Sequence, residues 1–147
     1  KTSGDICKAF GAGANVVMLG QMLSGTDEAP GEIIEIDGLK YKSYVGMGSL
    51  VAMKRGSSER YFQNAKKQSK LVPEGIEALV KYKGSVRDIL FQICGGIRSG
   101  LGYNGARNIA EISRKARFIK ITNNGLNESH PHSLSIIKDA PNYFGRV

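Results

Sequence analysis

The sequence predicts an α/β fold that its 147 residues do not complete. A helix-forming segment at the start is followed, after a short turn, by the unbroken apolar run of residues 16–19. Such a run is typical of a strand buried on both faces in a parallel sheet under helices. One helix–strand unit and the hairpins that follow it cannot close a known α/β sheet, so we expect other residues to supply the missing strands.

Composition and charge narrow the class of protein. The hydrophobic share of 41% and the mean hydropathy of -0.23 are ordinary for a globular domain, and the longest apolar run is far shorter than the roughly 20 residues that span a bilayer. The net charge of +8 raises nucleic acid as a partner. The basic residues are scattered among acids, however, and no RNA-binding aromatic motif or zinc spacing accompanies them. Small phosphorylated anions or an acidic neighbouring subunit explain the charge equally well, and the pattern disfavours nucleic acid.

The two cysteines and the start of the chain bear on its location. Cys7 and Cys94 lie far apart in apolar patterns without a CxxC partner, so we expect buried, reduced thiols. This fits a cytoplasmic protein. The sequence begins without an initiator Met or a leader-like segment, so we expect a fragment or a processed piece.

The first helix is predicted by its cap and its spacing. Thr2 or Ser3 can cap a helix whose first turn carries Asp5, and Ile6 and Phe10 then fall on one face. The apolar run of residues 16–19 would be the strand after it.

A glycine follows that predicted strand directly. Loops at the carboxyl ends of parallel strands are where α/β proteins place ligands. Gly20 and Gln21 could therefore offer backbone N–H groups to a phosphate, or Gly20 could simply end the strand.

The next segment predicts a hairpin and two loops. Asp37 and Gly38 join the strand-like runs 32–36 and 39–44 in the strongest short hairpin pattern. The hairpin would place Tyr44 before a glycine loop at residues 46–48. A short helix over residues 50–53 then leads into a polar, charged run to residue 70, which we expect to be a mobile flap.

The second half alternates extended and helical segments. We expect extended chain over residues 71–77 and 78–83 and a helix capped by Gly84-Ser85 that Gly95 and Gly96 end or loosen. We then expect a glycine-rich loop, a short helix, an alternating strand and a turn-rich tail, over residues 99–105, 108–116, 118–122 and 123–147.

Several of these segments together resemble one family of enzymes. In this order they are similar to the C-terminal part of the catalytic domain of bacterial-type inosine monophosphate (IMP) dehydrogenase. The resemblance covers nearly the whole chain and rests on the following blocks: Thr2-Ser3-Gly4-Asp5-Ile6, Val17-Met18-Leu19-Gly20, Ala29-Pro30-Gly31-Glu32, Tyr44 with Gly46-Met47-Gly48-Ser49, Gly56-Ser57 with Arg60-Tyr61-Phe62, Val72-Pro73-Glu74-Gly75, Gly95-Gly96 with Arg98-Ser99, and Glu128-Ser129-His130-Pro131-His132.

The resemblance implies a fold and a reaction. The fold would be a (β/α)8 TIM barrel, of which residues 1–147 form the C-terminal segment of one catalytic domain. The eighth strand would lie at 16–19, followed by the inserted hairpin, a flap at about 50–75 and a tail at about 123–147. The reaction is the NAD-dependent oxidation of IMP to xanthosine monophosphate (XMP) in guanine nucleotide (GMP) biosynthesis. Neither cysteine lies in a motif that matches the nucleophile, so the isolated segment would be inactive. A homotetramer is implied.

The matched positions imply specific roles. Arg60 and Tyr61 correspond to the pair on the flap that activates water for hydrolysis, although guanidinium is almost always protonated. IMP would be held by residues of three segments: Gly20, Gln21, Tyr44, Gly46, Met47, Gly48 and Glu74. The family usually has serine where Gln21 stands, which leaves that side-chain contact open, and Met47 could instead be simple core packing.

The end of the chain implies contacts to a cofactor and a metal. Tyr103 matches a residue that reaches the NAD site of a neighbouring subunit. Glu128, Ser129 and His130 match a segment that gives carbonyl oxygens to a potassium ion. His130 and His132 have no third ligand nearby and do not predict zinc.

Two other functions compete with this one. GMP reductase shares the barrel and the loop around Gly46 but has a different flap, so Arg60 and Tyr61 favour the dehydrogenase. The isolated chain could also be an inert basic fragment or a binding module.

Overall fold

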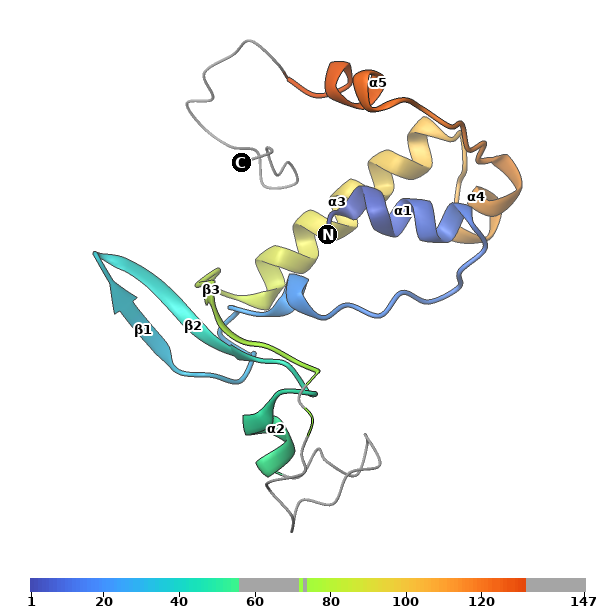
Figure 1. The fold of residues 1–147 in the computed structure, drawn as a ribbon. Helices are drawn as coiled ribbons and strands as arrows, with labels where there is room; N and C mark the ends of the chain where they lie inside the picture. Colours follow the sequence, from blue (N-terminus) through green and yellow to red (C-terminus); the bar gives the residue numbers. More distant parts are fainter. Residues whose placement is uncertain (56–71, 73, 132–147) are drawn as a thin grey trace. The chain divides into compact units, whose positions relative to one another are not determined.

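The computed structural model describes residues 1–55, 72 and 74–131 and divides the chain into two compact units (Figure 1). Arg60 and Tyr61 therefore lie outside the described residues. One unit comprises Lys1–Leu19 and Leu90–Val147, and the other comprises Gly20–Ile89. None of the described helices has both the length and the apolar character needed to cross a membrane. The helices and strands are α1 (Ser3–Gly11), η1 (Gln21–Leu23), β1 (Ile33–Ile36), β2 (Leu39–Val45), α2 (Leu50–Lys54), β3 (Glu77–Lys81), α3 (Val86–Tyr103), α4 (Ile109–Lys115) and α5 (Asn123–Glu128).

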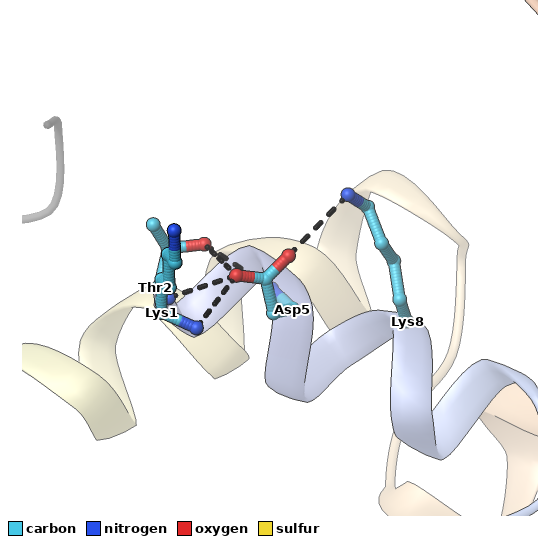
Figure 2. A network of polar contacts seen from close by, with 4 residues as sticks. All are labelled: Lys1, Thr2, Asp5 and Lys8. Atoms are coloured by element: carbon cyan, nitrogen blue, oxygen red, sulfur yellow. Dashed lines mark hydrogen bonds and ion pairs between the residues drawn. The ribbon is translucent and has the colours of Figure 1, made fainter. Parts of the chain in front are cut away.

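The first helix begins with the predicted cap. The Thr2 hydroxyl accepts a hydrogen bond from the Asp5 N–H at 3.2 Å, and the Asp5 carboxylate accepts one from the Thr2 N–H at 3.0 Å (Figure 2). This reciprocal capping box satisfies two N–H groups that a helix start leaves without intrahelical partners.

In the core of this unit, α1 packs against α4. Ile6 and Phe10 of α1 are buried, as is Ile112 of α4. Gly100 of α3 lies so close to α1 that a Cβ at this position would clash with the Cys7 sulfur.

Helix α3 is longer than the sequence predicts. Gly95 and Gly96 do not end the helix, and the expected loop from residue 99 is wrong, since the helix continues to Tyr103. Glycine inside a helix costs about 1 kcal/mol relative to alanine. At Gly100 the missing side chain leaves room for the Cys7 side chain of α1.

The two cysteines are free, and the prediction that both are buried is wrong. Cys7 is half-buried, and burial raises the pKa of its thiol. Cys94 is exposed, because it neighbours Ile93 on α3 without sharing the buried stripe of that helix.

Two predicted strands are also corrected. Residues 16–19 and 118–122 have no regular secondary structure. Val16 and Met18 are 84% and 96% exposed, which contradicts a strand buried on both faces. A strand needs a neighbour for its backbone hydrogen bonds, and neither run pairs with a strand in the described part of the chain.

Helices α4 and α5 show how caps set boundaries. The predicted helix after Asn108 is confirmed, because its side chain accepts a hydrogen bond from the Glu111 N–H at 3.0 Å. Thr122 caps α5 in the same way through the Gly125 N–H at 3.1 Å. The turn-rich composition after residue 122 concealed this helix.

The second unit is built on an antiparallel sheet in the order β1-β2-β3 (Figure 1). The predicted hairpin is confirmed, with Ile36 opposite Leu39 across the turn. Asp37 and Gly38 have φ values of 50° and 75°, the left-handed backbone that such turns require. The predicted short helix is also confirmed, as α2 begins after Ser49, whose hydroxyl accepts a hydrogen bond from the Ala52 N–H.

Candidate functional site

A hollow of about 550 Å³ in the second unit gathers four of the predicted nucleotide-binding residues. They come from two segments of the chain, Gly20 from the first and Tyr44, Gly46 and Met47 from the second. The other lining residues include both apolar and charged side chains: Leu23, Ser24, Thr26, Glu28, Ala29, Pro30, Gly31, Ser43, Val45, Arg55 and Val86. The structure thus places together residues that are 24 or more positions apart in sequence, as Gly20 and Tyr44 are.

Gly20 stands at the start of the short helix η1. Its carbonyl accepts the Leu23 N–H at 3.0 Å, and the Gln21 carbonyl accepts the Ser24 hydroxyl at 2.6 Å. These bonds hold the backbone in a tight turn. Gln21 is exposed and follows Gly20 at the edge of the hollow without lining it.

The end of β2 and the loop after it form another wall. Tyr44 lies opposite Ala78 of β3. The Gly46 N–H donates to the Ile76 carbonyl at 2.9 Å, and a Cβ on Gly46 would lie 3.2 Å from that oxygen. Met47 follows at 50% exposure, so it is not a core residue.

Gly48 and Glu74 lie next to this wall and do not line the hollow itself. The Gly48 carbonyl accepts hydrogen bonds from the N–H groups of Glu74 and Gly75, both at 2.9 Å. Two predicted base-binding residues are therefore joined through the backbone, although they are far apart in sequence.

The loop over residues 25–31 provides the facing wall. Gly25 and Gly31 have φ values of 81° and 116°, and a Cβ on either would clash with a carbonyl oxygen, of Lys81 and of Ser43 respectively. Glycine is required at both positions, because the loop lies directly against the sheet.

Acidic side chains fix the same loop. The Glu28 carboxylate accepts the Val86 N–H at 2.8 Å and the Ser85 hydroxyl at 3.1 Å, and the Val86 bond is the main cause of a lowered Glu28 pKa. The Asp27 carboxylate accepts the Tyr82 hydroxyl at 2.5 Å, which raises the pKa of Tyr82.

Two basic residues of this region were not predicted from the sequence. Arg55 follows α2 and lines the hollow. It lies in the polar run of residues 54–70 assigned to the flap, and nothing in its local pattern distinguishes it. Lys42 is buried under the loop, whereas lysine in an alternating strand is normally expected to face solvent.

A second hollow, of about 730 Å³, lies in the other unit. Tyr103 and His130 both line it, together with the start of α1 and one side of α3. The Tyr103 side chain is 90% exposed at the end of α3. Two residues predicted to contact NAD and potassium thus border one hollow.

The predicted potassium segment stands at the end of α5. Glu128 is its last residue and Ser129 is its C-cap, and the His130 N–H donates to the Asn127 carbonyl at 3.2 Å. A helix end presents carbonyl oxygens and the negative end of the helix dipole. These are hard oxygen donors, and their chemistry fits a monovalent cation.

Comparison with known protein families identifies the class. The family model described as the IMP dehydrogenase / GMP reductase domain matches residues 1–132. The chain therefore belongs to the IMP dehydrogenase / GMP reductase family, a family of TIM-barrel enzymes. It is a partial α/β segment of that fold, as the resemblance predicts, and its described part contains a three-stranded sheet and no closed barrel.

Individual relatives agree with this family. Inosine-5'-monophosphate dehydrogenase of Helicobacter pylori (strain ATCC 700392 / 26695) is 54% identical over 143 residues, and that of Streptococcus pyogenes is 58% identical over 144 residues. Each alignment covers 97% of this chain, which spans 30% and 29% of the relatives' lengths. A crystal structure of GMP reductase from Trypanosoma brucei in complex with guanosine 5'-monophosphate matches with a TM-score of 0.78 at 47% identity, over 92% of this chain and 27% of that one.

Proposed function

We propose that this chain supplies the nucleotide-binding loops of an NAD-dependent IMP dehydrogenase, which oxidises IMP to XMP. The observation that carries the proposal is the hollow lined by Gly20, Tyr44, Gly46 and Met47. The resemblance to the family assigns these residues to IMP, and they come from two separate segments of the chain. The relatives named IMP dehydrogenase, at 54% and 58% identity, support the same activity.

The phosphate of IMP would bind at the glycine end of the hollow. Backbone N–H groups at Gly20 and Gln21 donate to phosphate oxygens without a side chain in the way. The hydroxyl of Tyr44 adds a further donor, and the guanidinium of Arg55 adds positive charge at the rim. Because the contact at position 21 uses the backbone, glutamine in place of serine leaves it intact.

The purine would bind toward Met47. The half-exposed thioether side chain offers a soft apolar surface for a flat base. Gly48 and Glu74, joined by their backbone hydrogen bond, would then lie at the edge of the base, where the Glu74 carboxylate can accept a hydrogen bond from a ring N–H.

Hydrolysis would depend on residues outside the described part of the chain. Arg60 and Tyr61 are proposed to position and deprotonate the water that releases XMP. The cysteine nucleophile and the remaining barrel strands would come from other residues of the intact protein. Exposed Val16 and Met18 suit a segment that pairs with such strands.

When NAD is bound, it would accept the hydride that is removed from IMP. The exposed Tyr103 ring fits a contact with a flat base in a neighbouring subunit's NAD site, since aromatic faces stack on bases. The carbonyls of Glu128, Ser129 and His130 would hold a potassium ion that steadies the tail. Both roles imply a homo-oligomer, which we propose to be a cytoplasmic tetramer.

GMP reductase is the second candidate. The GMP-bound T. brucei structure, at 47% identity, shows that this chain's fold also serves a reductase. The higher identity to IMP dehydrogenases, together with Arg60 and Tyr61, favours oxidation of IMP.

The proposed site can be tested at Tyr44 in the intact protein. Tyr44→Phe removes one phosphate donor and should raise the KM for IMP about tenfold, because a hydrogen bond to a charged group is lost. Binding of inosine, which lacks the phosphate, should be unchanged. Tyr41→Phe, on the opposite face of β2, is the matched control. An unchanged KM for IMP in Tyr44→Phe would refute the phosphate assignment.

A further inference from the structure

Lys42 is buried although its side chain carries an ammonium group. Only 4% of the residue is exposed, and lysine is almost never fully buried without partners. Its Nζ donates to the carbonyl oxygens of Thr26 at 2.6 Å, Asp27 at 3.0 Å and Ala29 at 2.5 Å. An ammonium has three N–H donors, so the loop satisfies all of them.

These three carbonyls are the hydrogen-bond partners of the ammonium group, and the Glu28 carboxylate is an anion near enough to interact with its charge. The ion pairs among the described residues involve Asp5 and Glu111 and none involves Lys42. Removing an ammonium from water is unfavourable unless each donor is bonded. The arrangement therefore holds only while the loop keeps the conformation that directs three carbonyls inward.

The residues held by Lys42 are also walls of the nucleotide hollow. Thr26 and Ala29 line it, and Glu28 lies between them. The bond from the Lys42 Nζ thus lies behind the surface that a ligand would touch. Its positive charge also reaches this wall, since it adds to the lowering of the Glu28 pKa that the Val86 N–H mainly causes.

Other bonds fix only parts of the loop. Tyr82 holds the Asp27 side chain, and Ser85 and Val86 hold that of Glu28. Lys42 alone among the described side chains ties the backbone at three points of one turn.

We propose that Lys42 is a positioning residue for the nucleotide site, which sets the wall formed by residues 26–29 and places a positive charge behind it. The inference rests on the proposed function, because it assumes that the hollow binds an anionic nucleotide. Lys42 touches no reacting atom, so it should affect binding of the nucleotide far more than the chemical step.

The test uses four variants of the intact protein. Lys42→Met keeps the length of the side chain and removes the charge and donors, and Lys42→Gln is a second neutral variant in case Lys42→Met does not fold. Lys42→Arg keeps the charge. Lys40→Met removes a lysine from an exposed position on the same face of β2. We would measure the KM for IMP and for NAD, kcat, the Kd of IMP by calorimetry, and hydrogen exchange of residues 26–31.

A neutral residue at position 42 should raise the KM and Kd of IMP about tenfold or more, with the KM for NAD and kcat little changed. Exchange should accelerate at residues 26–31. Lys42→Arg keeps the charge but its larger planar guanidinium cannot reproduce the three convergent bonds, so its affinity for IMP should lie between those of the native protein and the neutral variants. Lys40→Met should behave as the native protein.

Three other results would each overturn the inference, and they show whether the proposed function fails as well. If the native protein binds IMP and the neutral variants bind it equally well, or lose IMP and NAD affinity alike, Lys42 is not a positioning residue and the proposed function stands. If the native protein does not bind IMP at all, the proposed function fails and the inference fails with it.

Discussion

The backbone N–H of Glu74 donates a hydrogen bond of 2.9 Å to the carbonyl oxygen of Gly48. The neighbouring N–H of Gly75 donates to the same oxygen, also at 2.9 Å. Both lone pairs of one carbonyl are thereby used, and two segments that were separately predicted to contact the purine are held together. The geometry of the base site therefore depends on main-chain contacts as well as on side chains.

Gly75→Ala should disturb this contact. A Cβ at position 75 would lie 2.5 Å from the Ser49 nitrogen and 2.7 Å from the Gly48 carbonyl carbon, so the backbone has to shift. Overpacking of this kind destabilises proteins by about 1–3 kcal/mol. We expect a lower free energy of unfolding in urea and a higher KM for IMP. Gly95→Ala is the control, because a Cβ there meets no atom within 4 Å. Equal behaviour of the two variants would contradict the contact.

Glu111 should make stability depend on acidic pH. Its carboxylate accepts the Arg107 N–H at 3.0 Å, the chief cause that lowers its pKa from 4.5 to about 2, and also bonds to the Arg107 and Lys115 side chains. A lowered pKa means that the folded state favours the charged form. The stabilisation is thus complete above pH 4.5 and is lost as the pH falls toward 2.

Glu111→Gln should remove this part of the pH dependence. Urea unfolding of the native protein and the variant at several pH values between these limits would measure it. Glu35→Gln, which removes an exposed carboxylate from β1, serves as the control. If Glu111→Gln loses stability with acid as steeply as the native protein, the hydrogen bonds of Glu111 do not have the assigned effect.

The proposed reaction has two steps, hydride transfer from IMP to NAD and the hydrolysis that releases XMP. Arg60→Gln should slow the second step and leave the first largely intact. If Arg60 activates water, its loss should slow steady-state turnover by about 100-fold or more, the usual range of acid–base catalysis. The first-turnover burst of NADH should persist, because hydride transfer precedes hydrolysis. Stopped-flow absorbance measures both, with Arg87→Gln as a surface control. Equal loss of both steps would rule out the role.

Local chemistry predicted those elements whose ends are fixed by nearby residues. Thr2 and Asn108 supply helix caps, and Asp37-Gly38 supplies a turn, so α1, α4 and the β1–β2 hairpin follow from sequence. Each depends on bonds between residues a few positions apart.

Predictions that depended on distant partners were less successful. Residues 16–19 have the composition of a strand, but a strand forms only where another strand pairs with it. From the sequence, Gly100 is expected to interrupt a helix, and only the structure shows that α1 packs against it. Lys42 carries no sequence signal of burial, because the three carbonyls that hold it come from 13 to 16 residues earlier. The nucleotide residues were found through the family resemblance, whereas the loop that faces them required the structure.

An assay of the intact protein with IMP and NAD, and separately with GMP and NADPH, distinguishes a dehydrogenase from a reductase. IMP with NAD should yield XMP and NADH, with no consumption of NADPH in the presence of GMP. NADPH-dependent conversion of GMP to IMP, without NADH formation from IMP, would contradict the proposed dehydrogenase activity and assign the chain to a reductase.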